Sequence, residues 1–140
     1  MSDVSRTARV GDVGEHVLIA EIARRLGQGN SAIVGIGDDA AVVRLSEPSV
    51  AVSTDVLVQD RHFRLTWSSA TDIGPRVAGA NLADVASMGA MPTCLVVGLV
   101  LPPDTEVGWV LDFLDGLADE CEGIGASVVG GDLASGDTIM

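Results

Sequence analysis

The chain has 140 residues, the length of one domain, and 47% of them are apolar, so a packed core is expected rather than disorder. Its formal net charge is −12, from 20 acidic residues against 8 arginines and no lysine, which argues against a nucleic-acid partner. The first 14 residues are polar and no apolar run reaches membrane-spanning length, so neither a signal peptide nor a membrane span is predicted. Two isolated cysteines, Cys94 and Cys121, fit a cytoplasmic protein with buried thiols.

The first predicted element is a helix that ends at Leu26. Residues 1–11 are polar and are expected to fray. Asp12 and Glu15 resemble a capping box, and apolar residues then recur at helical spacing until Gly27 ends the pattern.

A hairpin is predicted next. Residues 32–37 form a short connection into a strand at 40–45, and a turn at 47–49 leads to a partner strand at 50–54. The polar stretch 59–69 is expected to be irregular.

The second half predicts helices and strands in alternation. They are a helix from Thr71 or Asp72 to about Met88, a fully buried strand Thr93–Leu101, a helix Thr105–Glu122, a strand Ser127–Gly130 and a last strand from Thr138. This order indicates an α+β fold, a mixed sheet with helices packed on one face. The whole chain, 1–140, is expected to be a single domain, and its end within a predicted strand suggests a fragment of a longer protein.

Aspartates mark the edges of four apolar, glycine- or alanine-rich segments. These are GIGDDAAV (35–42), STD (53–55), NLADVASMGA (81–90) and VGGD (129–132). A carboxylate in such surroundings needs a compensating charge. Since the chain has no lysine, we expect Mg²⁺, which prefers oxygen ligands and is often shared with substrate phosphates.

The first two segments each have a plainer interpretation. Asp38 suits a Gly-Asp turn before a strand, and Asp39, one position nearer the strand, is the better metal ligand. Ser53, Thr54 and Asp55 follow an apolar strand, where a helix cap or Asx turn is equally common. Three adjacent oxygen-bearing residues, however, offer a cation both backbone and side-chain ligands.

The other two segments are weighed in the same way. Asn81 and Asp84 are three residues apart and share one helical face, on a helix that is apolar almost all round. A buried helix seldom contains an unpartnered aspartate, which favours a functional Asp84. Gly131 and Asp132 follow a buried strand, where glycine lets a phosphate approach the backbone, although Gly-Gly-Asp is also a common hairpin turn.

His62 lies in the irregular stretch beside Arg61 and Arg64. An anionic substrate group could be received there. A surface histidine in a mobile loop explains the same pattern equally well.

Taken together and in this order, the four segments resemble the thiamine-monophosphate kinases of the AIR-synthetase-like ATP-binding superfamily. The similarity includes STDVLVQDRHF, from Ser53 to Phe63, and covers nearly the whole chain. It implies Mg²⁺-dependent phosphorylation of thiamine monophosphate to thiamine diphosphate by ATP. Carried over by position, the implied metal ligands are Asp39, Ser53, Thr54, Asp55, Asp84 and Asp132; the implied ATP contacts are Gly131 and Asp132; and the implied substrate contact is His62.

The resemblance also implies a homodimer in which the sheets of two such domains meet, and a C-terminal domain that this sequence lacks, so the isolated chain is expected to be inactive. No catalytic acid or base is predicted, because a phosphate oxygen acceptor is already ionised near neutral pH. Two alternatives stay open: a related ATP-dependent dehydratase of hydrogenase maturation, and a non-catalytic dimerisation module.

Overall fold

The computed structural model describes residues 4–29 and 31–140. Its elements, in chain order, are α1 (Val10–Val13), α2 (Glu15–Leu26), β1 (Ala32–Val34), β2 (Val42–Val43), α3 (Ala70–Ser87), β3 (Cys94–Leu101), α4 (Val107–Glu122) and β4 (Ser127–Ser135). Within the described residues the strands form an antiparallel pair, β1–β2, and a parallel pair, β3–β4. The predicted α+β class is confirmed. None of the helices in this part of the chain is long and apolar enough to span a membrane.

The N-terminal segment is more ordered than the sequence predicted. Residues 1–3 lie outside the described residues, but Val10 donates its amide hydrogen to the carbonyl oxygen of Thr105 at 2.9 Å, and α1 follows. The predicted capping box is wrong, because Gly14 is the N-cap of α2 and makes no side-chain cap. Gly27 ends the helix as predicted, with φ of 66°.

The predicted hairpin has the wrong partner strand. β2 pairs with the preceding segment β1, through a loop whose Gly37 has φ of 110°. Because β2 is already paired with β1, it does not pair with the segment that follows it. Residues 50–58 run extended without belonging to a strand. Their backbone is instead held by a side chain of α3, which a reading of strand pattern alone cannot foresee.

The second half of the chain follows the prediction closely. α3 begins at the N-cap Ser69, two residues earlier than expected, with a capping box completed by Asp72. α4 connects β3 to β4. The two strands pair in parallel over their full lengths, with a register shift between Leu95 and Val96 of β3. β4 is longer than predicted and continues through Asp132, so the Gly-Gly-Asp segment lies within a strand and not in a turn. The predicted last strand from Thr138 is not formed; instead, Met140 alone exchanges two backbone hydrogen bonds with Val100 of β3.

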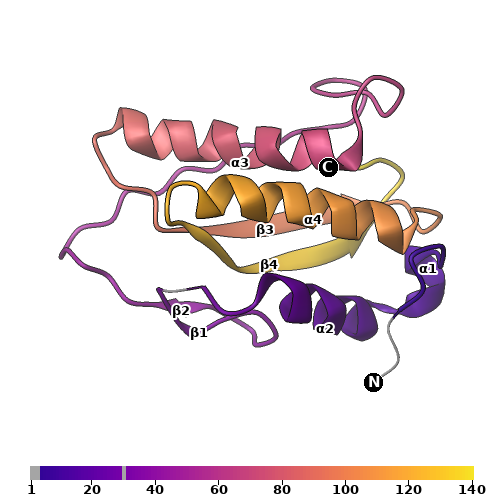
Figure 1. Cartoon of the computed structure of the whole chain (residues 1–140), viewed down its shortest axis with the longest axis horizontal. Helices are drawn as coiled ribbons and strands as arrows, with labels where there is room; N and C mark the ends of the chain where they lie inside the picture. Colours follow the sequence, from indigo (N-terminus) through magenta and orange to yellow (C-terminus); the bar gives the residue numbers. More distant parts are fainter. Residues whose placement is uncertain (1–3, 30) are drawn as a thin grey trace.

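The core lies between the two long helices and the parallel strands. Figure 1 shows α4 lying over β3 and β4, with α3 alongside α4 and α2 along the lower edge. Apolar side chains of α4 fill this region because they recur on one face of the helix. The most buried apolar residues are Leu18, Ile73, Ala78, Leu101, Val107, Val110, Leu117, Cys121 and Val129.

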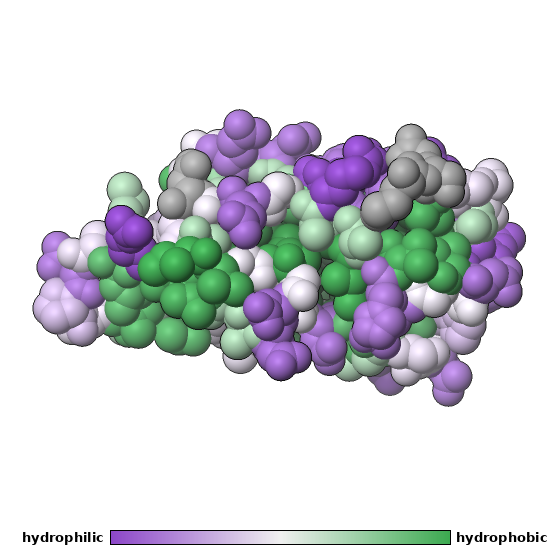
Figure 2. Space-filling view, turned by 90° about the horizontal axis from the view of Figure 1, so that it is seen from below, coloured by the Kyte–Doolittle hydropathy of each residue, from purple (hydrophilic) through white to green (hydrophobic). Residues whose placement is uncertain are grey.

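One part of the surface is unusually apolar. The prediction that β3 is fully buried is wrong, since Val96 is 70% exposed. Val52 in the extended segment is 85% exposed, and Val50 and Val56 are also exposed. Figure 2, which views the molecule from the side of α2 and β1–β2, shows green apolar areas separated by purple polar residues. Exposed apolar areas on one face of a protein often mark interaction sites.

Candidate active site

Several carboxylates in the chain have structural roles that set them apart from the predicted site. Arg25 pairs with Asp115 and lowers the pKa of that carboxyl group. The Ser69 hydroxyl lowers the pKa of Asp72 in the capping box at the start of α3. Arg24 similarly lowers the pKa of Glu21. These acids are explained by folding alone.

The predicted ligand residues Ser53, Thr54 and Asp55 lie against the C-terminal half of α3. The backbone amide of Asp55 donates a hydrogen bond to Asn81 Oδ1 at 2.9 Å, and Ser53 Oγ donates to Asp84 Oδ2 at 3.3 Å. Ser53, Asp55 and Asp84 are exposed, whereas Asn81 is half-buried. The structure therefore brings two of the four motifs together, with the carboxylates facing outward.

Asn81 explains how this contact is held. Its side-chain amide donates to the carbonyl oxygen of Val77 one turn earlier at 3.0 Å, while its Oδ1 accepts from Asp55. Both ends of the amide are thus bonded, and its orientation is fixed. The expectation that Asp84 is buried is wrong, because Asp84 and Met88 are both exposed.

The other two motifs meet at a different place. A cavity of about 820 Å³ is lined by the loop 35–41, by the middle of β3 and by residues 130–133 of β4. Asp38, Asp39 and Asp132 all line it. Asp38 accepts a hydrogen bond from the backbone amide of Asp39 at 2.9 Å, as a turn residue does. The side-chain carboxylate of Asp39 takes no part in this bond and is free for a ligand.

Sequence reasoning missed the contribution of α2 to this cavity. His16 and Glu15, in the first turn of α2, line it together with Ile19 and Leu26. The signal was present, because His16, Ile19 and Leu26 are separated by three and seven residues and so share one face of a helix.

Gly131 has a structural reason to be glycine. A Cβ atom there would lie 2.1 Å from the carbonyl oxygen of Val97, its partner in the β3–β4 ladder. Asp132, the next residue, pairs with Gly98 and is exposed. Close packing of the strands thus accounts for the glycine, and the exposed carboxylate is what remains available to a ligand.

His62 lies apart from both groups. It closes a turn in which the amide of Val58 donates to its Nδ1 at 2.9 Å, and its own amide donates to the Val58 carbonyl at 2.9 Å. In Figure 1 this turn lies beyond the N-terminal end of α3, whereas Asp84 is near the other end. At 1.5 Å per residue, Asp84 is about 21 Å along the helix axis from its first residue, so His62 and Asp84 of one chain are far apart.

The oxygen donors are chemically suited to Mg²⁺. No hydrogen bond or ion pair to a cationic group reaches the carboxylates of Asp39, Asp55, Asp84 or Asp132 within residues 4–29 and 31–140. In the same residues, however, no three His, Cys, Asp or Glu side chains lie close enough to hold a metal ion. The structure therefore presents two sets of donors, one at 53–55 with Asp84 and one around the larger cavity.

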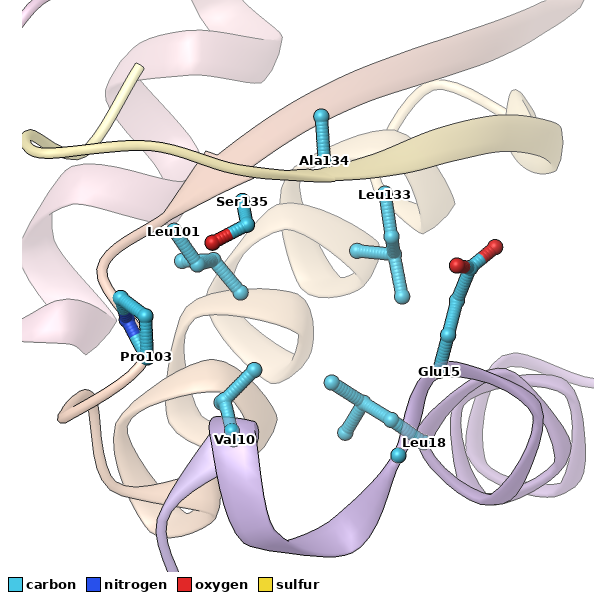
Figure 3. Close-up of a pocket in the computed structure, with 10 residues that line it drawn as sticks. Val10, Glu15, Leu18, Leu101, Pro103, Leu133, Ala134 and Ser135 are labelled. Atoms are coloured by element: carbon cyan, nitrogen blue, oxygen red, sulfur yellow. The ribbon is translucent and has the colours of Figure 1, made fainter.

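A second cavity, of about 390 Å³, lies between α1, α2 and the ends of β3 and β4. Figure 3 shows Val10, Leu18, Leu101 and Leu133 pointing into it, with Glu15 at one side. None of the predicted site residues lines it. Its walls are mainly apolar, and it is not the site that the motifs define.

Comparison with known proteins finds similar sequences and similar solved structures. A Mycobacterium tuberculosis protein named thiamine-monophosphate kinase is 42% identical over 123 residues, which are 88% of this chain and 37% of the relative. The crystal structure of thiamine-monophosphate kinase from Stenotrophomonas maltophilia K279a has a TM-score of 0.73 and 32% identity, over 87% of this chain and 38% of that one. A structure of AaThiL complexed with AMPPCP and TMP has a TM-score of 0.64 and 32% identity, over 96% and 42%.

The chain thus spans well under half the length of the curated relatives it matches. Residues 37–140, most of its length, match the family model described as AIR synthase related protein, N-terminal domain. The chain belongs to the AIR synthase related protein, N-terminal domain family.

Proposed function

We propose that the protein containing this chain transfers the γ-phosphoryl group of ATP to the phosphate of thiamine monophosphate, giving thiamine diphosphate and ADP. The observation that carries the proposal is the contact of Ser53 and Asp55 with Asp84 and Asn81, which gathers exposed oxygen donors without a cationic partner. Relatives named thiamine-monophosphate kinase and the complex of AaThiL with AMPPCP and TMP support the reaction and its two substrates.

We propose Mg²⁺ as the cofactor, held by two sets of donors: Ser53, Thr54, Asp55 and Asp84 in one, and Asp39 and Asp132 in the other. Bound there, it would neutralise the phosphate charge that an acidic protein otherwise repels. Asn81 keeps the 53–55 segment against α3 and so orients the donors of that segment. We also propose that Gly131 and Asp132 contact ATP and that His62 contacts the thiamine substrate.

The chain is proposed to be the N-terminal domain of a longer cytoplasmic enzyme, with the remaining ligand residues in a C-terminal domain. We further propose a homodimer. The exposed valines Val50, Val52 and Val96 supply an apolar contact surface. Replacing Val52 by Glu should yield a monomer in analytical ultracentrifugation, and an unchanged sedimentation coefficient would contradict this surface.

The reaction is tested with the full-length protein, ATP, thiamine monophosphate and Mg²⁺, by measuring ADP and thiamine diphosphate. The Asp84→Asn variant should lose more than about 100-fold in kcat/KM, beyond the loss typical of outer-shell partners of a metal site. Asp119→Asn, an exposed aspartate on α4, is the matched control and should retain full activity. Absence of thiamine diphosphate, or undiminished turnover by Asp84→Asn, would refute the proposal.

A further inference from the structure

Trp67 is the one aromatic side chain that the fold leaves outside the core. The chain contains two Trp and two Phe and no Tyr. Phe63 and Phe113 are buried, and Trp109 packs partly buried against the core with its ring stacked on Phe113 at 5.7 Å. Trp67, by contrast, is 76% exposed. Leaving an indole in water forgoes the stabilisation of a large apolar group, so its position calls for a reason other than packing.

The indole is nevertheless held in a defined place. The guanidinium carbon of Arg64 lies 4.4 Å from the centroid of the Trp67 ring. The amides of Trp67 and Ser68 both donate to the Arg64 carbonyl at 3.0 Å, which closes a turn between the two side chains. The preceding Phe63 is buried and anchors the segment to the core. A ring fixed in this way loses little conformational entropy when a ligand stacks on it.

The charge of this segment is opposite to that of the chain. Among the described residues, Arg6 and Arg25 pair with carboxylates, whereas Arg61 and Arg64 have no carboxylate partner in the same residues. A cationic spot on a chain of net charge −12 attracts an anion locally. An aromatic ring next to guanidinium groups without carboxylate partners suits a small anionic ligand that carries a planar heteroaromatic ring.

His62, in the same segment, adds a hydrogen-bond donor. Its Nδ1 accepts the Val58 amide hydrogen, so the proton of the neutral imidazole is on Nε2. The segment 58–68 therefore offers a stacking surface, positive charge and an imidazole N–H donor within a few residues of one another.

We propose that Trp67 stacks on a heteroaromatic ring of thiamine monophosphate, with Arg64 as a positioning residue that holds the indole. This inference rests on the proposed function and names a residue for acceptor recognition that the aspartate motifs do not include. Thiamine monophosphate fits the chemistry because it joins planar heteroaromatic rings to an anionic phosphate. ATP is the weaker candidate, since its proposed contacts are at Asp132, on β4.

The test compares Trp67→Ala, Trp67→Phe and Arg64→Gln with the unaltered full-length protein. Base–aromatic stacking in other proteins is worth roughly 1–3 kcal/mol, so Trp67→Ala should raise both the KM and the Kd for thiamine monophosphate about 10-fold. The KM for ATP and the far-ultraviolet circular dichroism spectrum should not change. Trp67→Phe should restore most of the affinity because it keeps a ring, and Arg64→Gln should show a smaller loss. Leu65→Ala, which removes another exposed side chain of the same segment, is the matched control and should bind normally.

The outcomes separate this inference from the reaction itself. If the unaltered protein neither binds nor phosphorylates thiamine monophosphate, the proposed function fails, and the inference fails with it. If the unaltered protein binds it and Trp67→Ala binds it equally well, only the inference is overturned. A Trp67→Ala variant with normal affinity but an altered sedimentation coefficient would assign the indole to a contact between copies, which also overturns it.

Discussion

Two glycines of α3 provide a direct test of how α3 and α4 pack. A Cβ atom on Gly74 would lie 2.2 Å from the carbonyl oxygen of Phe113 and 2.7 Å from the amide nitrogen of Leu117. Both atoms belong to the backbone of α4, so no side-chain rotation can make room. A Cβ atom on Gly79, in the same helix, would meet only the flexible Glu120 carboxylate at 3.8 Å.

The two Gly→Ala replacements should therefore change stability in opposite directions. Alanine is better than glycine inside a helix by roughly 0.5–1 kcal/mol, and Gly79→Ala should gain about that much. Gly74→Ala gains the same propensity, but overpacking costs about 1–3 kcal/mol, and more where backbone must move. We expect the free energy of unfolding of Gly74→Ala to fall by about 1–2 kcal/mol.

Urea unfolding of the 140-residue chain, followed by far-ultraviolet circular dichroism, measures both values. The two midpoints should lie on opposite sides of that of the unaltered chain, with an unchanged dependence on urea concentration. Equal stabilisation of both variants would refute the close approach of α3 and α4 at Gly74.

Three further predictions concern stability and reactivity. Ser69→Ala removes the capping box of α3 and should lower the free energy of unfolding by about 1 kcal/mol in the same assay; no change would contradict the cap. Asp115 has a pKa below its ordinary value of 3.8 because of Arg25, so its stabilisation is present above that pH and is lost as the pH falls through the lowered pKa. Urea midpoints measured on acidification should accordingly fall less for Asp115→Asn than for the unaltered chain. Burial raises the pKa of the Cys121 thiol to about 11, so a thiol-reactive disulfide reagent should modify it only after urea unfolds the chain, and rapid labelling of the native chain would count against its burial.

The fold prediction was accurate for elements that the local sequence determines and less accurate for those that depend on distant parts of the chain. α4 and β3 were predicted almost to the residue, because a long periodic pattern and a long apolar run each specify one element. The predicted pairing of 40–45 with 50–54 was wrong because β2 pairs with β1, and strand pairing depends on tertiary context that a local pattern does not specify. β1 is only three residues long, so its sequence pattern was too short to predict it as the partner of β2.

The candidate site shows the same division. The spacing of Asn81 and Asp84 correctly placed both on one face of α3, where each bonds the 53–55 segment. The exposure of Asp84 was not predicted, because an apolar helix in a small domain can leave one side uncovered. His16 was missed because its contribution to the cavity depends on where α2 packs against the loop 35–41.

The packing at Gly131 has a consequence for genetics. Any other amino acid at this codon places a carbon atom against the Val97 carbonyl oxygen, so a saturation screen will score every missense change there as damaging, whatever the codon contributes to chemistry. Such a score reports on strand pairing before it reports on a nucleotide. Only the neighbouring Asp132, whose side chain is exposed, allows the two effects to be separated by mutation.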